Sequence, residues 1–293
     1  MEVNPPQKSN TSTPLNQTQQ HHNQKKTPEN HVRKLMLDTW GKSIFSEIKY
    51  RLQNSAMKIV YSERINEPFD SQLVIGVRES YVNLCSDPED KLKIYKENFE
   101  KAYLESEIEF FNKHAQQFIT DNGIISYLTY ADNKLKEEEK RAQKYLETCK
   151  GSNSLEIHRQ TCIDVLVTKY QDEMIAECRN LIQNNDIKNL NILFQLLDQI
   201  PNVEPLLMDL EEYILNEGLM IMKVNSETIT SDPEKYVEQL LELFNLFTKL
   251  VNDAFNGDPR FMTCRDKAFK LIVNDTSIFQ IDFSTGNNNN QKM

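Results

Sequence analysis

The densest group of ionisable side chains in this sequence is EEEKR, residues 137–141, within the segment YLTYADNKLKEEEKRAQKYLE at 127–147. Adjacent carboxylates can hold a metal ion or transfer protons. A helical di-carboxylate metal site also uses a histidine three residues after a glutamate, and none of these glutamates has one. The alternatives are a free coiled coil or the solvent-facing side of a packed helix.

Helical periodicity favours the packed helix, because one face of this segment is apolar. That face carries Leu128, Ala131, Leu135, Ala142 and Leu146. Glu137 points away from it, and we expect both Glu137 and Glu138 to pair with Arg141 at helical spacing. Glu138 falls on the apolar face itself. We therefore predict that Glu138 is at least half buried and paired with a cation, either Arg141 or one from a neighbouring helix.

The other candidates for chemistry are weaker. Gly41-Lys42-Ser43 resembles the end of a phosphate-binding loop but lacks the upstream glycine and the strand. His21-His22 lies in a polar tail, and His114 and His158 are isolated, so we expect the latter two to be exposed or at helix ends. We expect buried thiols at the five cysteines, which lie on or next to apolar stripes: Cys85, Cys149, Cys162, Cys178 and Cys264. No catalytic, metal or cofactor site is predicted.

Composition narrows the class of protein. The chain has 293 residues, and its 7 glycines favour helices joined by short loops, since strands and tight turns use glycine freely. A net charge of −10 argues against nucleic acid or an anionic membrane as partner. No apolar run approaches the roughly 18 residues of a membrane span, and there is no secretory signal. The scattered, odd number of cysteines suits the cytoplasm or nucleus.

The elements between two polar tails are helical. Residues 1–30 and the Asn-rich residues 282–293 carry too few apolar side chains to fold and are predicted to be disordered. Helical periodicity predicts helices at about 31–60 (broken or kinked near Gly41 or Asn54-Ser55), 70–85, 89–116, 127–147, 154–184, 190–200, 205–224, 232–255 and 258–273. Asp70 or Ser71 is the expected cap of the second, and Gly123 separates 89–116 from 127–147. The result is an all-α helical repeat rather than a compact bundle.

Several of these segments resemble the cullins, in the cullin order, over about residues 31–280. They are YLTYA with Leu135, Glu137, Glu138, Arg141, Tyr145 and Leu146; LVIGVRESYVNL (73–84); IYKENFEKAYLESEIEFF (94–111); KYVEQLLELFNLFTKLVNDAF (235–255); and DPRFMTCRDKAF (258–269). The stretches 32–40 and 69–92 resemble cullin five more narrowly.

The resemblance implies a fold of stacked five-helix cullin repeats, which form the elongated stalk of multisubunit ubiquitin ligases. By this resemblance residues 31–50 are the last helix of repeat one, 51–185 are repeat two, and 186–281 are part of repeat three. The first four helices of repeat one and the C-terminal cullin domain have no counterpart, so we expect a stalk fragment without a RING partner.

The resemblance also implies partners. Cullins of this type hold an elongin C-type adaptor, and with it a substrate receptor, through the second and fifth helices of repeat one. Here the fifth helix would place Val32, Arg33 and Met36 at the adaptor, with Leu35, Leu37 and Trp40 expected in the core. Without its partner helices, this helix should also expose apolar surface.

The expected function is that of a non-catalytic scaffold fragment of a cullin–RING ubiquitin ligase, acting in ubiquitin-dependent protein degradation. The alternative is a helical protein-interaction module that does not assemble a ligase, such as a decoy or a tethering rod. An enzyme with a diffuse site is the least favoured hypothesis.

Overall fold

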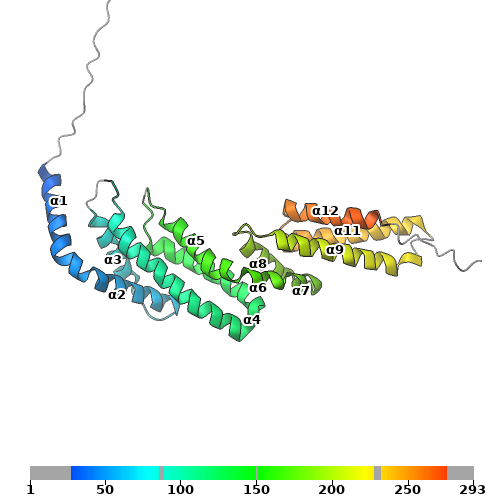
Figure 1. Cartoon of the computed structure of the whole chain (residues 1–293), viewed down its shortest axis with the longest axis horizontal. Helices are drawn as coiled ribbons and strands as arrows, with labels where there is room; N and C mark the ends of the chain where they lie inside the picture. The colour runs from blue at the N-terminus through cyan, green and yellow to red at the C-terminus, as the bar shows by residue number, and fades with distance from the viewer. Residues whose placement is uncertain (1–27, 86–88, 150, 228–231, 276–293) are drawn as a thin grey trace, which may run out of the picture. The chain divides into compact units, whose positions relative to one another are not determined.

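The computed structural model describes residues 28–85, 89–149, 151–227 and 232–275, and the regular structure in these ranges is helical (Figure 1). The chain forms two compact units, Met1–Glu47 and Ile48–Met293. The predicted tail 282–293 and residues 1–27 of the predicted tail 1–30 lie outside the described residues. The first helix already begins at Pro28, three residues before the predicted boundary. No helix in the described ranges is long and apolar enough to cross a membrane.

The N-terminal helical run is α1 (Pro28–Trp40), a π-helical turn η1 (Gly41–Phe45) and α2 (Ser46–Arg64). The predicted break near Gly41 is therefore this π turn, which inserts a residue into the helix. Asn54 and Ser55 lie inside α2, so no break occurs there. Trp40 stacks on the buried Phe45 with ring centroids 5.7 Å apart.

The long helix α4 (Lys101–Tyr145) follows α3 (Ser71–Asn83) and a π-helical turn η2 (Tyr95–Glu100). As predicted, Asp70 caps α3 by accepting a hydrogen bond from the backbone N–H of Gln72 at 2.9 Å. Also as predicted, Gly123 interrupts the helix, with φ 79° and ψ 165°, a conformation that essentially only glycine adopts. The chain folds back there, and Phe118 stacks on Tyr130 with centroids 4.3 Å apart. Consequently the arms 101–122 and 124–145 lie side by side.

The single helix predicted at 154–184 is wrong in detail. The structure divides it into α5 (Ser154–Leu166), a 3-10 turn η3 (Thr168–Tyr170), α6 (Gln171–Ala176) and α7 (Cys178–Gln183). Val165, Leu166 and Val167 are consecutive and all buried. One face of a straight helix cannot bury three successive side chains, and the turn after Leu166 re-aims them. The helical run ends at Gln183, one residue before the predicted end at 184, and Asn185 follows with φ 52°.

The remaining described helices are α8 (Ile187–Leu197), α9 (Glu204–Val224), α11 (Pro233–Phe255) and α12 (Pro259–Val273). One continuous apolar core runs from the arms of α4 to α12. A Cβ atom on Gly218 would fall 2.3 Å from Cδ1 of Ile272, so α9 and α12 pack closely there. On α11, Leu243 is buried in this core, whereas Val237 and Leu241 are exposed.

Candidate functional site

Glu138, the glutamate on the apolar face of the EEEKR segment, is 1% exposed. It accepts hydrogen bonds from Nε and a terminal nitrogen of Arg64 on α2, both at 3.2 Å, and a further one from Arg141. The prediction that Glu138 is buried and paired with a cation is confirmed. The pair predicted between Glu137 and Arg141 is wrong, because Glu137 pairs with Lys134 at 2.6 Å on the exposed side of the helix.

Arg64 is the central cation of this buried cluster. Its guanidinium lies between Glu138 and Glu107, 3.8 Å from Oε1 of Glu107, and over the ring of Tyr103. Burial raises the pKa of the Glu138 carboxyl, against the opposing effect of the Arg64 and Arg141 charges. The cluster therefore ties the end of α2 to both arms of α4 through charges that water does not reach.

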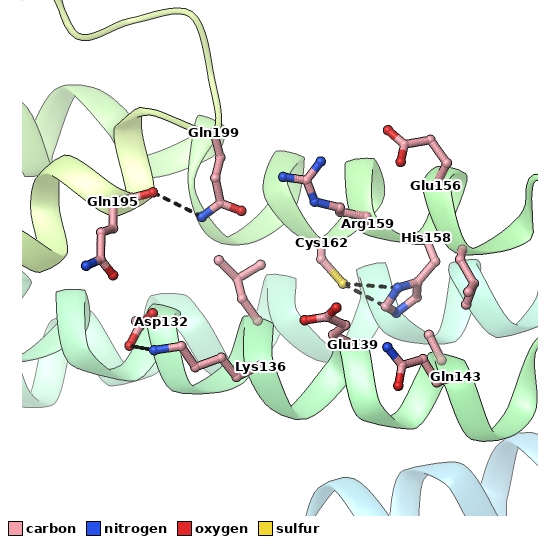
Figure 2. Close-up of a pocket in the computed structure, with 13 residues that line it drawn as sticks. Asp132, Lys136, Glu139, Gln143, Glu156, His158, Arg159, Cys162, Gln195 and Gln199 are labelled. Carbon is pink, nitrogen blue, oxygen red and sulfur yellow. Dashed lines mark hydrogen bonds and ion pairs between the residues drawn. The ribbon is translucent and has the colours of Figure 1, made fainter. Parts of the chain in front are cut away.

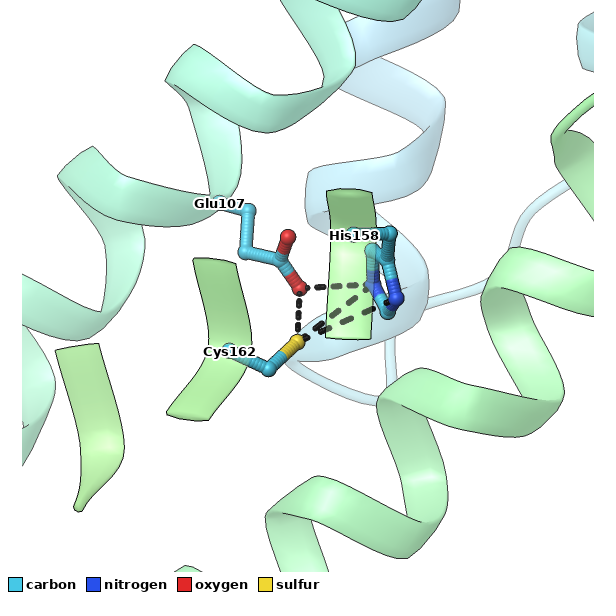
Figure 3. Close-up of side chains that lie close together, drawn as sticks. All are labelled: Glu107, His158 and Cys162. Carbon is cyan, nitrogen blue, oxygen red and sulfur yellow. Dashed lines mark hydrogen bonds and ion pairs between the residues drawn. The ribbon is translucent and has the colours of Figure 1, made fainter. Parts of the chain in front are cut away.

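Glu107 also contacts two side chains of α5 (Figure 3). Its Oε1 lies 3.0 Å from Nε2 of His158 and 2.9 Å from Sγ of Cys162, and these last two atoms are 3.4 Å apart. The expectation that His158 is exposed or helix-terminal is wrong, since it is 2% exposed. His158 and Cys162 are four residues apart, so both face α4 from one side of α5.

The Cys162 thiol is unsuited to nucleophilic catalysis. Burial and the adjacent Glu107 carboxylate raise its pKa, so it is a protonated donor to that carboxylate. A reactive cysteine needs the opposite, a positive environment that stabilises the thiolate. Burial acts to raise the pKa of Glu107 too, but the hydrogen bond from His158 and the charge of Arg64 hold it below its usual value. In this triad of Glu107, His158 and Cys162, the thiol is therefore a hydrogen-bond donor and not an activated nucleophile.

A groove of about 440 Å³ runs along the second arm of α4, α5 and α8 (Figure 2). Its rim is polar and includes an ion pair between Lys136 and Asp132 at 2.6 Å. Leu135, His158 and Cys162 also line it. The groove therefore reaches two members of the triad from outside.

The residues predicted to contact an adaptor, Val32, Arg33 and Met36, are all exposed on α1. The structure places Val32 and Met36 one turn apart on the same face, 59% and 67% exposed. The core positions predicted on this helix are corrected: Leu35 is 64% exposed and Trp40 is 37% exposed. The described part of the compact unit that contains α1 does not cover this face, which is why these side chains remain in solvent. Leu37 is partly buried.

Sequence could have revealed more of the buried cluster. Glu107 lies four residues from both Tyr103 and Phe111, which are buried, so it occupies an apolar stripe as Glu138 does. His158 lies on the stripe of Cys162 and Leu166 in the same way. Arg64 likewise follows the buried Ala56 and Val60 at four-residue spacing, but its pairing with Glu138, 74 residues away in the chain, has no signal in the spacing.

Comparison with known proteins identifies the family. The model of the cullin alpha solenoid domain matches residues 10–292, beyond the predicted range at both ends. Cullin-5 of Caenorhabditis elegans is 38% identical over 258 residues, which are 87% of this chain and 34% of that protein. Cullin-1 of Dictyostelium discoideum is 30% identical over 249 residues, 83% of this chain and 32% of that protein.

The chain thus spans about a third of the length of these curated relatives. The helical architecture of the described residues agrees with the all-α solenoid that the sequence predicted, and the repeat boundaries at 50 and 185 stay predictions. This chain belongs to the cullin family.

Proposed function

We propose that this chain is a non-catalytic scaffold segment of a cullin–RING ubiquitin ligase, acting in ubiquitin-dependent protein degradation by binding an adaptor protein. Membership of the cullin family supports the scaffold role. The buried side chains support the scaffold role as well. The charges of Arg64 and Glu138 join helices, and the Cys162 thiol is held protonated beside Glu107.

The observation that carries this proposal is the apolar face of α1. Val32, Leu35 and Met36 are each more than half exposed, and Trp40 continues the same face one turn on. An exposed strip of large apolar side chains at helical spacing is typical of a helix that docks against a protein partner. Arg33, also exposed, can supply a polar contact at its edge. The proposed partner is an elongin C-type adaptor that carries the substrate receptor.

We also propose that the protein works in the cytoplasm or the nucleus. All five cysteines are free, and Cys162, Cys178 and Cys264 are buried thiols as expected, whereas the expected burial is wrong for Cys149, which is exposed, and for Cys85, which is partly exposed. Free thiols are maintained in reducing compartments, where the ubiquitin ligases of this family would act.

Co-purification tests the proposal. The tagged chain is expressed in cells and recovered together with its partners, which are then identified by mass spectrometry and antibodies. Recovery of an elongin C-type adaptor supports the proposed surface, and recovery of a RING protein with it indicates assembly of a ligase. Adaptor without a RING protein indicates a decoy. Recovery of neither contradicts the proposed function.

A further inference from the structure

We propose that Glu107, His158 and Cys162 form a binding site for a divalent zinc-class metal ion, which would link the first arm of α4 to α5. Carboxylate oxygen, imidazole nitrogen and thiolate sulfur are the three protein ligand types that zinc uses. In the described residues, one atom of each type meets here, all within 4.8 Å of one another and all on buried residues (Figure 3). This inference is independent of the adaptor proposal.

The geometry is close to that of a tetrahedral site. Bonds of about 2.3 Å to sulfur and about 2.0 Å to nitrogen or oxygen place tetrahedral ligand atoms about 3.3 to 3.5 Å apart. The sulfur of Cys162 and Nε2 of His158 are already 3.4 Å apart. Oε1 of Glu107 lies 2.9 Å from the sulfur and 3.0 Å from Nε2. The carboxylate oxygen would therefore have to move away by about 0.3 Å from Nε2 and about 0.6 Å from the sulfur.

A second observation also points to a cation. Within the described residues, Oε2 of Glu107 is buried and has no hydrogen-bond partner. A buried carboxylate oxygen without a partner costs free energy, and a cation bound at Oε1 would reduce that cost by neutralising the negative charge that the two oxygens share. Arg64 does not fill this role, because its hydrogen bonds go to Glu138 and Ser106 and it approaches Glu107 no closer than 3.8 Å.

The groove supplies both access and a fourth ligand. His158 and Cys162 line it, so an ion can reach them from solvent, and a water molecule in the groove can complete the tetrahedron (Figure 2). Binding replaces the proton of the Cys162 thiol by the metal, and that proton leaves to solvent through the groove. His158 binds through Nε2 as neutral imidazole, so the proton that Nε2 donates to Glu107 is given up to solvent and Nδ1 carries the ring proton in the bound state.

Cobalt(II) spectroscopy and zinc competition test the site. The full chain is used with His21→Gln, His22→Gln, His31→Gln, Cys85→Ala and Cys149→Ala, which removes five other histidine and cysteine ligands outside the triad. Addition of Co²⁺ is expected to give one equivalent of tetrahedral d–d absorption with a thiolate charge-transfer band. Zn²⁺ should displace the cobalt and raise the unfolding temperature.

Two variants and a matched control complete the test. Cys162→Ser should abolish the charge-transfer band, and Cys162→Ser and Glu107→Gln should each weaken zinc binding at least about 10-fold. Cys178→Ser, at an equally buried cysteine outside the triad, should leave the charge-transfer band and the zinc affinity unchanged. Far-UV circular dichroism verifies that each variant is folded. Two results would overturn the proposal. The first is the absence of a tetrahedral cobalt spectrum, as expected for a hydrogen-bonded triad without metal affinity. The second is equal zinc binding by the substituted reference chain with and without Cys162→Ser.

Discussion

Glu138→Ala is expected to destabilise the larger compact unit far more than a substitution at any exposed glutamate of the same helix. The side chains of Glu138 and Arg64 are each 1% exposed, and that of Arg141 is 7% exposed. Removal of the carboxylate leaves both guanidinium groups without their principal acceptor in a site that water does not reach. Loss of one partner of a buried ion pair costs about 3 to 5 kcal/mol.

The adjacent residue gives the matched control. Glu137 belongs to the same EEEKR run, but its side chain is 49% exposed and its partner is the partly exposed Lys134. An exposed pair at helical spacing contributes only about 0.3 to 0.5 kcal/mol. The free energy of unfolding, measured by urea titration with far-UV circular dichroism, should therefore fall at least about five times more for Glu138→Ala than for Glu137→Ala.

A double substitution separates the lost ion pair from lost packing. Arg64→Met with Glu138→Leu replaces this pair by apolar groups of similar volume, and it should recover part of the stability lost in Glu138→Ala, since Arg141 keeps its charge without Glu138. Equal effects of Glu138→Ala and Glu137→Ala would refute the reasoning, because they would mean that the carboxylate is not buried between two cations.

Two further predictions concern the backbone and pH. Gly123→Ala should lower the free energy of unfolding by about 1 to 3 kcal/mol, because φ is 79° at the fold-back of α4. The control Gly76→Ala lies inside α3 with open space around it, and it should leave the free energy of unfolding unchanged or raise it by up to about 1 kcal/mol. Equal urea midpoints for the two variants would count against the fold-back. Asp258 caps α12, and the hydrogen bonds that it accepts from Arg260 lower its pKa. Its negative charge therefore stabilises the fold at any pH above the unfolded-state pKa of about 3.9. This stabilisation is lost as the pH falls through the lower pKa that Asp258 has in the folded protein. Asp258→Asn should keep the cap at neutral pH but reduce the loss of stability on acidification, and an unaltered pH profile would be inconsistent with this role.

Local patterns were enough to predict most of the helices. The cap at Asp70 and the break at Gly123 depend on one or two residues whose chemistry allows few alternatives. The burial of Glu138 followed from helical phase alone, since it shares a face with Leu128 and Ala142. Periodicity is reliable over a long amphipathic helix, where many positions report the same face.

The features that the sequence missed depend on other parts of the chain. The turn after Leu166 exists because both sides of residues 165–167 meet apolar neighbours, which a single-helix pattern does not show. Neither the contact between Glu107 and His158, 51 residues apart, nor the partnership of Arg64 with Glu138 has a signature in sequence spacing. Leu35 was assigned to the core because it is apolar, but its exposure depends on which helices lie beside α1.

Titration calorimetry of an elongin C-type adaptor with this chain and two variants measures whether α1 presents the adaptor-binding face. Met36→Asp places a charge in the proposed interface, and Met208→Asp is the control, because Met208 on α9 is 69% exposed and Met36 is 67% exposed. Met36→Asp should weaken binding at least about 10-fold, as for an interface residue worth about 1.4 kcal/mol or more, and Met208→Asp should leave it unchanged. Equal affinities for the wild type and Met36→Asp, or no binding by the wild type, would mean that α1 is not the adaptor-binding face.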